Sequence, residues 1–127
     1  MITAWIAAPL MIFVALLGLR ISRLRLTGRA RSADQDTLAL FERWQRAHGN
    51  LVEHAPMVLI LLYLLERAYG SGPLVKIVGV TFLASRLLHA YGTVMPSRYP
   101  KMAGAALTYL VEITLGGVLL ARMIQTL

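Results

Sequence analysis

The sequence contains no cysteine and few acidic residues, with six Asp and Glu against thirteen Lys and Arg. Without cysteine the chain forms no disulfide bond, supplies no thiolate ligand to a metal and has no thiol nucleophile of its own. Aromatic residues make up only 8% of the chain and are not interleaved with the basic residues, which argues against nucleic-acid binding despite the net charge of +7. Any thiol chemistry therefore has to arrive with a ligand.

Apolar residues, by contrast, make up 57% of the 127 residues, and they are gathered in long blocks. These blocks are residues 2–19, 55–65, 77–85 and 102–121, the last interrupted by Glu112. A helix needs about 20 residues to cross the hydrocarbon core of a membrane, so the blocks predict four transmembrane helices. Short connections make sequential helices antiparallel. We therefore expect one all-α domain over residues 1–127, an integral membrane up-down four-helix bundle.

Proline, glycine and capping residues set the expected helix limits. Pro56 removes one backbone hydrogen bond inside the second helix and predicts a kink near residues 52–56. Asp36 or Thr37 is the expected cap of that helix. The four helices are expected over residues 3–24, 37–69, 73–92 or slightly beyond, and from about 101 onward, after a loop at 95–100.

The basic residues predict how the chain is oriented in the membrane. Nine of the thirteen lie in two segments that follow the first and the third helix: Arg20, Arg23, Arg25, Arg29, Arg31, Arg43, Arg46, Arg98 and Lys101. The positive-inside rule places these segments in the cytoplasm and both termini outside. No basic residue precedes Arg20, unlike in a secretory signal, so we expect the first helix to remain in the mature protein.

A stripe of polar side chains runs into the apolar part of the second helix. Its members recur every three or four residues and share an arc of roughly 100°: Arg43, Arg46, Asn50, Glu53 and His54. Charged groups at bilayer depth need partners, so the stripe is expected to face something other than lipid. Arg86, His89 and Glu112 are further polar groups within the apolar blocks. Glu53 and Arg86 are predicted to pair.

Two interpretations of these polar residues stay open. Either Glu53, Arg86 and Glu112 form a structural network that fixes the helix register, or the group binds a ligand. For a ligand, arginines suit carboxylates, Glu53 suits an ammonium and Asn50 suits an amide, which together fit a small zwitterionic polyanion. A metal site is disfavoured, because the three histidines include neither a pair four residues apart nor a Glu-x-x-His motif.

The residues of this stripe resemble a known signature. Residues 41–56, FERWQRAHGNLVEHAP, are similar to the helix-two pattern F-E-R-x-x-R-A-x-x-N-x-x-E-x-x-P of the MAPEG family, membrane-associated proteins in eicosanoid and glutathione metabolism. Residues 85–92, SRLLHAYG, resemble the helix-three signature of the bacterial inner-membrane branch of that family. The similarity extends over nearly the whole chain, in length and in four-helix hydropathy.

The resemblance implies a homotrimer with the second helix along the three-fold axis. It implies that glutathione binds as co-substrate between adjacent subunits, near the cytoplasmic side of a bacterial inner membrane. Arg86 would pair with Glu53, and His54 stands where some relatives carry tyrosine. The residues implied at the tripeptide are Arg43, Arg46, Asn50, Glu53, Arg86, His89, Tyr91 and Thr93, with Arg20 or Arg23 reaching over from the neighbouring subunit.

The function implied is that of a glutathione transferase or peroxidase. An arginine at the start of the fourth helix would stabilise the thiolate and lower a thiol pKa that begins at about 8.5; Arg98 is the choice here, with Lys101 as the alternative. The thiolate would attack a small hydrophobic electrophile or a lipid hydroperoxide that enters from the bilayer. Two other functions stay open: a non-catalytic scaffold that binds lipid or thiol, and a small four-helix exporter with Glu112 as coupling carboxylate.

Overall fold

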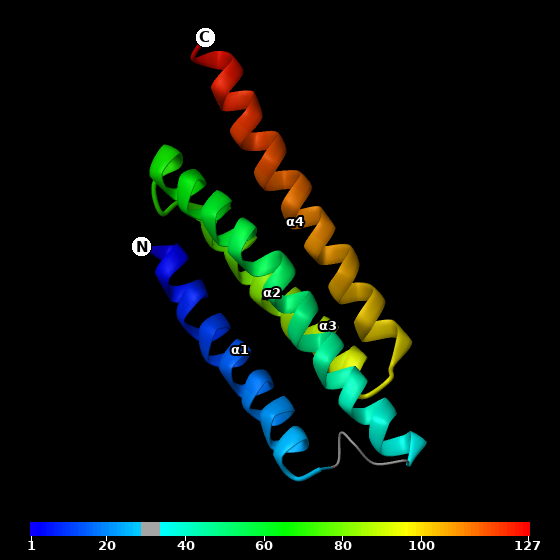
Figure 1. Cartoon of the computed structure of the whole chain (residues 1–127). Helices are drawn as coiled ribbons and strands as arrows, with labels where there is room; N and C mark the ends of the chain where they lie inside the picture. The colour runs from blue at the N-terminus through cyan, green and yellow to red at the C-terminus, as the bar shows by residue number, and fades with distance from the viewer. Residues whose placement is uncertain (29–33) are drawn as a thin grey trace.

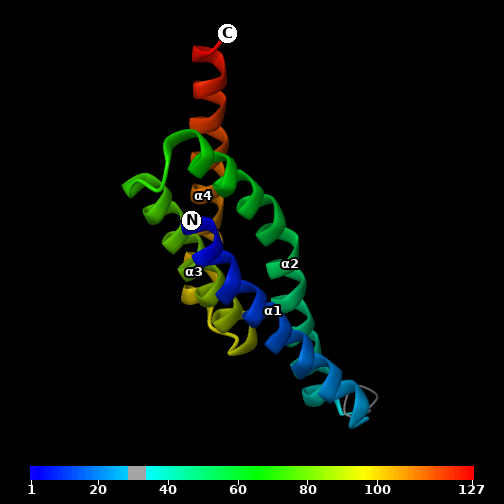
Figure 2. The same cartoon turned by 90° about the vertical axis from the view of Figure 1, so that its left-hand side faces the viewer.

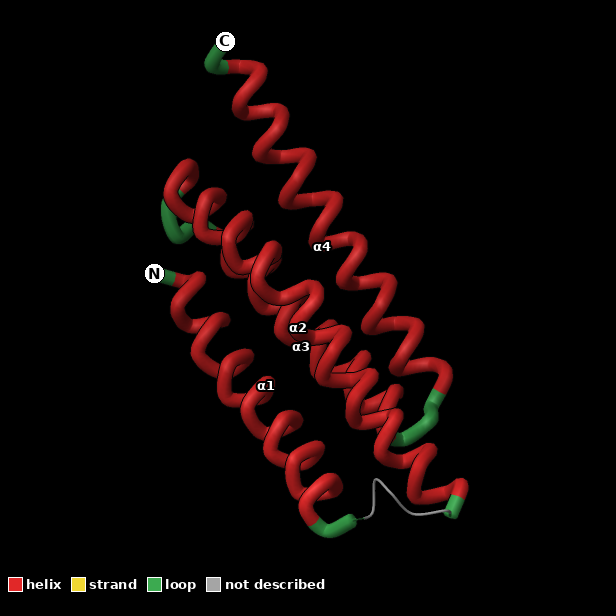
Figure 3. The backbone as a smooth tube through the Cα atoms, in the orientation of Figure 1, coloured by secondary structure: helices red, strands yellow, loops and turns green. Residues whose placement is uncertain are grey.

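A computed structural model describes residues 1–28 and 34–127 of the chain. Within these residues the structure consists of four helices and no strand: α1 (Ile2–Leu26), α2 (Gln35–Tyr69), α3 (Pro73–Val94) and α4 (Arg98–Gln125). Sequential helices run antiparallel (Figure 1, Figure 3), and short connections join α2 to α3 and α3 to α4. The predicted all-α, up-down architecture is confirmed. Arg29 and Arg31, two of the basic residues that predict the membrane orientation, lie outside the described residues.

The four helices do not all contact one another. The longest helix, α2, contacts each of the other three, and α3 packs along α4, whereas α1 and α4 make no contact within the described residues. The carboxyl-terminal part of α4 extends past the ends of its neighbours (Figure 1, Figure 2). One side of α2 and much of α4 are therefore left uncovered in a single protomer.

Three of the helices, α1, α3 and α4, are long and apolar enough to cross a membrane. The remaining helix, α2, has 35 residues and is therefore roughly 50 Å long. That length is well beyond the roughly 30 Å thickness of the hydrocarbon core of a membrane. Its amino-terminal part carries most of the polar stripe. The chain is thus an integral membrane protein in which α2 combines an apolar part with a long polar part.

Apolar side chains from all four helices form the core, with Val111 and Leu115 contributed by α4. Leu10, Leu62 and Phe82 are fully or almost fully buried there. The packing of α3 against α4 is closer still, because it brings backbone against backbone. A Cβ atom placed on Gly104 would lie 2.5 Å from the backbone nitrogen of His89, so only glycine fits at this contact.

The ends of two helices differ from the predicted limits. The cap of α2 is Asp34 and not Asp36 or Thr37, since its carboxylate accepts hydrogen bonds from the Thr37 nitrogen at 3.3 Å and from the Thr37 hydroxyl at 2.6 Å. The fourth helix begins at Arg98, three residues earlier than expected. Pro100 is compatible with this start, because backbone N–H groups in the first turn of a helix have no partner within the helix, so the N–H that proline lacks is not missed. Through Pro56, α2 stays continuous as a bowed helix (Figure 2).

A buried carboxylate fastens α1 to α2 at the end remote from the polar stripe. Glu66 accepts hydrogen bonds from the backbone nitrogens of Ile2 at 2.5 Å and Thr3 at 2.9 Å, and from the Thr3 hydroxyl at 2.7 Å. The hydroxyl of Ser71 completes the set at 2.6 Å. Glu66 therefore satisfies orphan donors at the start of α1 and also holds the turn that leads to α3. No motif or spacing in the sequence marks this residue.

Candidate functional site

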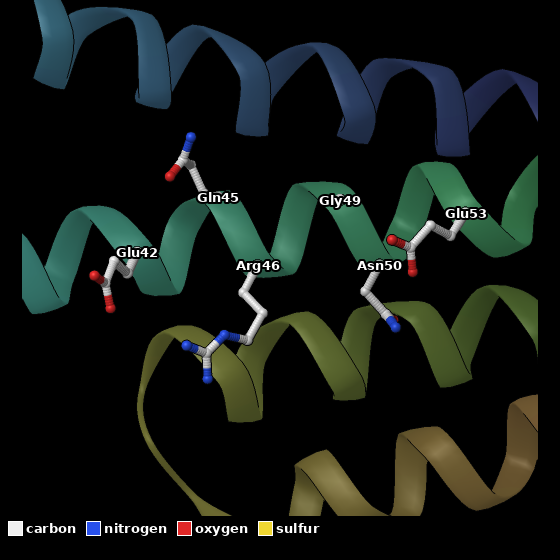
Figure 4. Close-up of a pocket in the computed structure, with 6 residues that line it drawn as sticks. All are labelled: Glu42, Gln45, Arg46, Gly49, Asn50 and Glu53. Carbon is white, nitrogen blue, oxygen red and sulfur yellow. The ribbon is translucent and has the colours of Figure 1, made fainter.

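The polar face of α2 borders a hollow of about 440 Å³. Its lining comes from this helix alone, at spacings of three and four residues (Figure 4): Glu42, Gln45, Arg46, Gly49, Asn50 and Glu53. The opposite face of the same helix is buried in the protomer through Ala47, Leu51 and Ala55. The structure thus brings Arg46, Asn50 and Glu53 together on a surface that the protomer itself leaves open.

A second hollow, of about 340 Å³, adjoins the first. Arg46 lines both, so the two hollows meet at this side chain. The second hollow lies where the end of α3 meets the start of α4, and Thr93 and Ser97 contribute to its wall. It brings four basic side chains together: Arg43, Arg46, Arg98 and Lys101. Arg98 and Lys101, the two candidates for the thiolate cation, therefore share this surface with the arginines of α2.

Arg86 is bound differently from the prediction. Its guanidinium, 2% exposed, donates to the Oδ1 of Asn50 at 2.7 Å and to the hydroxyl of Thr108 on α4. Within the described residues it forms no ion pair with Glu53, so that expectation was wrong. The reason is geometric: Glu53 lies about one turn beyond Asn50 on the exposed side of α2, whereas Arg86 faces the seam between α2 and α4.

The bond from Arg86 also fixes how Asn50 meets a ligand. A guanidinium only donates hydrogen bonds, so the oxygen of the Asn50 amide must face Arg86. The NH₂ group of Asn50 is then the part left for the hollow that this residue lines. A carboxylate or carbonyl of a ligand fits that donor. Asn50 is therefore positioned to donate a hydrogen bond to a ligand and not to accept one.

A second polar contact joins α2 to α4. The Nδ1 of His54 lies 2.5 Å from the Oε1 of Glu112, and the ring of Tyr109 meets the His54 ring edge-on at 6.3 Å. Within the described residues, Glu53, Arg86 and Glu112 do not contact one another, as the structural interpretation of these residues would require; Arg86 bonds to Asn50, and Glu112 contacts His54. The sequence offered one signal for the second pair, which is that Glu112 interrupts the apolar block 102–121 and His54 directly precedes the block 55–65.

Besides Arg86, three predicted ligand residues do not line either of the two hollows. His89 is buried in the close contact of α3 with α4, where its backbone oxygen accepts a hydrogen bond from Thr93 at 2.8 Å. Tyr91 is exposed and lines an apolar hollow bordered by α1, α2 and α3. Arg23 is exposed near the end of α1. The neighbouring Arg20 instead stacks on Trp44, with its guanidinium carbon 5.6 Å from the ring centre.

Fold and site together define an integral membrane four-helix protein with a polar hollow along its longest helix. The chain belongs to the MAPEG family, whose family model matches residues 2–121. It is also similar to proteins described as inner membrane protein YecN from two strains of Escherichia coli. Each of these is 40% identical over 47 residues, which cover 37% of this chain and 36% of the relative. The match thus spans about a third of the length of these relatives.

Proposed function

We propose that this protein is a membrane glutathione transferase or peroxidase that binds glutathione in the two adjoining hollows and activates its thiol. The observation that carries the proposal is the charge around this surface. Four cations, Arg43, Arg46, Arg98 and Lys101, outnumber two carboxylates, Glu42 and Glu53, which leaves a net charge of +2. Glutathione in its thiolate form, with two carboxylates, one ammonium and one thiolate, carries the opposite net charge.

The individual groups support the same ligand. Guanidinium groups bind carboxylates in a bidentate manner, which Arg46 and Arg43 offer from successive turns of α2. Glu53 at the far end of the first hollow suits the ammonium group of the tripeptide. Between them the NH₂ of Asn50 donates to a ligand oxygen. In this arrangement the tripeptide lies along α2, and its thiol points toward Arg98 and Lys101.

The chemistry proposed is thiol activation. A cation beside the sulfur favours the thiolate, so the thiol proton leaves to water and the sulfur keeps its electron pair. The thiolate then forms a bond to the electrophilic carbon of an apolar substrate while the leaving group departs with the bonding pair. With a lipid hydroperoxide, sulfur would attack the terminal oxygen, the oxygen–oxygen bond would break, and the alkoxide would take a proton from water.

The proposal includes a homotrimer in an inner membrane. A single helix lines the first hollow, so a neighbouring subunit is needed to close it around a ligand. The uncovered side of α2 offers the surface for that contact. The inner-membrane location is supported by the printed description of the Escherichia coli relatives. Both termini would lie outside, with the basic ends of the helices at the cytoplasmic face.

One observation favours a second candidate, a scaffold that binds lipid or thiol without catalysis. The side chain of Arg98 is exposed, and its Nε donates to the sulfur of Met102 at 3.4 Å. An arginine held in this way lies at the rim of the hollow. A scaffold would bind glutathione and leave its thiol pKa unchanged.

The test is to add glutathione to the purified protein and to record the ultraviolet absorbance of the thiolate and the rate of conjugation to a generic aryl halide. Wild type is compared with Arg98→Ala and Lys101→Ala. We expect thiolate formation and conjugation in the wild type, and a loss of about tenfold or more in one of the two variants, which corresponds to about 1.4 kcal/mol. Binding without thiolate in every variant would favour the scaffold.

Lys76→Ala is the matched control. Lys76 is an exposed cation near the start of α3, whereas Arg98 begins α4, beyond the other end of α3. Its removal lowers the total charge by the same amount as the test variants. We expect it to leave thiolate formation unchanged, so that an equal loss in Lys76→Ala would assign the effect to overall charge and contradict the site.

A further inference from the structure

The carboxylate of Glu112 lies in the apolar part of α4 and is not enclosed by the protomer. The side chain of Glu112 is 33% exposed, and Ile113 beside it is 73% exposed. Lys101, near the start of the same helix, precedes Glu112 by three helical turns, which is roughly 16 Å along the helix axis. Glu112 therefore lies about half-way across a hydrocarbon core of roughly 30 Å, where an ionised group needs a partner for its charge.

The hydrogen-bonding capacity of this carboxylate is only partly used. Its Oε1 lies 2.5 Å from the Nδ1 of His54, and within the described residues its Oε2 accepts no hydrogen bond. Glu66 of the same protein, by contrast, is 6% exposed and accepts four hydrogen bonds. A carboxylate that only held helices together would be expected to resemble Glu66. The open oxygen of Glu112 is therefore available to a further partner.

The positive charge that His54 brings to Glu112 is replaceable. An imidazole gains and loses its proton near neutral pH, so His54 compensates the carboxylate only while it is protonated. The charge of Arg86 is permanent by comparison, and its guanidinium is held by Asn50 and Thr108. The titratable and charged groups around the pair are Arg86 and His89 on α3, Tyr109 on α4 and Glu53 on α2. The variable positive charge in this group is thus the proton on His54.

The surroundings of Glu112 select the kind of cation that can replace this proton. In the part of the chain that the structure describes, no three His, Asp or Glu side chains are placed to hold a metal ion. A hydrated inorganic ion would also lose its water in the hydrocarbon core. The ring of Tyr109 is 57% exposed and meets the His54 ring edge-on at 6.3 Å. Aromatic faces attract organic cations, so the group fits a cation that is covered by apolar substituents.

We propose that Glu112 and Tyr109 bind a lipophilic organic cation from the bilayer in exchange for the proton of His54. The carboxylate keeps its negative charge, the imidazole releases its proton to water, and the organic cation takes the place of the imidazolium. The net charge inside the membrane is the same before and after the exchange. Glu112 lines neither of the hollows proposed for glutathione, so this binding is separate from the thiol chemistry.

The experiment compares methyltriphenylphosphonium, a permanent organic cation, with triphenylphosphine oxide, which has the same aromatic rings and no net charge. Binding of each to the full-length protein in a non-ionic detergent is measured by calorimetry over about pH 5 to 8. We expect the phosphonium to bind at least about tenfold more tightly than the oxide. Because the proton competes with the cation, the affinity for the phosphonium should rise with pH until His54 is neutral. Titrations in two buffers of different ionisation enthalpy should show that protons are released on binding.

Three variants locate the exchange. Glu112→Gln is expected to abolish the preference for the phosphonium over the oxide. Asp36→Asn, which removes an exposed carboxylate near the start of α2, is the matched control and should retain the preference. His54→Gln should retain the preference and lose both the pH dependence and the release of protons. If Glu112→Gln does not fold, the comparison of phosphonium with oxide across pH in the wild type still decides.

Four results would overturn the proposal. Equal affinity for phosphonium and oxide in the wild type would show that charge is not recognised. Phosphonium binding that is independent of pH and releases no proton would rule out the exchange with His54. A preference that persists in Glu112→Gln, or that is lost equally in Asp36→Asn, would assign the effect to another carboxylate or to overall charge. A lack of saturable binding would mean that the pair is covered in the assembly, for example by a second copy of the chain.

Discussion

The guanidinium of Arg86 donates a hydrogen bond to the amide oxygen of Asn50, over 2.7 Å and from α3 to α2. The same guanidinium also reaches Thr108 and the backbone oxygen of Gly104 on α4. One buried cation thus joins three helices directly behind the first hollow. Because the amide oxygen of Asn50 is bound to Arg86, Asn50 presents a hydrogen-bond donor, and not an acceptor, to a ligand in the first hollow.

This arrangement predicts the outcome of Asn50→Asp. The new carboxylate keeps the partner Arg86, so we expect thermal stability close to that of the wild type. It has no NH₂ group and places a negative charge beside a ligand oxygen. We therefore expect glutathione affinity, measured by calorimetry, to fall about tenfold to a hundredfold, since a hydrogen bond to a charged group contributes about 1.5–3 kcal/mol. Unchanged affinity would contradict the assigned direction of Asn50.

The carboxylate of Glu66 predicts a stability effect at the other end of the molecule. Glu66→Ala removes the acceptor of four hydrogen bonds at the start of α1 and in the turn after α2. We expect a loss of about 3 kcal/mol, seen as a lower melting temperature in detergent. Glu66→Gln keeps one acceptor oxygen, so its melting temperature should lie between those of the wild type and Glu66→Ala. Ligand binding on the distant polar face of α2 should persist in both variants below the melting temperature.

The close contact of α3 with α4 predicts opposite results for two glycines of one helix. In Gly104→Ala the new methyl group would meet the backbone of His89 and Ser85 at 2.5–2.8 Å, so the helices must move apart. We expect a loss of about 1–3 kcal/mol, the usual range for overpacking. Gly116→Ala is the control, because nothing lies within 4 Å of the added atom and alanine favours the helix. Equal effects would contradict the close contact.

The cap of α2 predicts a pH dependence outside the membrane. Hydrogen bonds from the side chain and then the backbone of Thr37 lower the pKa of Asp34 from its ordinary 3.8. The ionised cap therefore stabilises the start of α2 above that ordinary pKa, and the contribution is lost as pH falls through the lower folded value. We expect the amide resonance of Thr37 to titrate with a midpoint below 3.8. Asp34→Asn should remove that titration, and a higher midpoint would contradict the cap.

The helices and the polar stripe could be predicted because they depend on local pattern. Long apolar blocks fix four helices, and spacings of three and four residues place Arg46, Asn50 and Glu53 on one face. The pairing of buried groups could not be predicted, since it depends on the rotation of one helix against another. A shift of one turn decides whether Arg86 meets Glu53 or Asn50. The same limit applies to Tyr91, which the family resemblance placed at the thiol site, whereas in the structure it lines the apolar hollow bordered by α1, α2 and α3.

The contact between His54 and Glu112 can be tested by a double-mutant cycle. The two groups lie at the depth of apolar blocks and are half-buried, with side-chain exposures of 21% and 33%. Removal of either one leaves the other without its partner, so His54→Gln and Glu112→Gln should each cost about 1–3 kcal/mol. The double variant should cost less than their sum, with a coupling of about 1 kcal/mol or more.

Thr114→Ala supplies the comparison for this cycle. Its hydroxyl bonds to the backbone of its own helix, so it should combine additively with His54→Gln. Unfolding free energies of all variants can be measured in mixed detergent. Coupling in the first cycle alone would establish that the carboxylate of Glu112 is held by α2 as part of the fold. Additivity in both cycles would instead leave Glu112 as an intramembrane carboxylate free to exchange protons, which is the feature that an exporter requires.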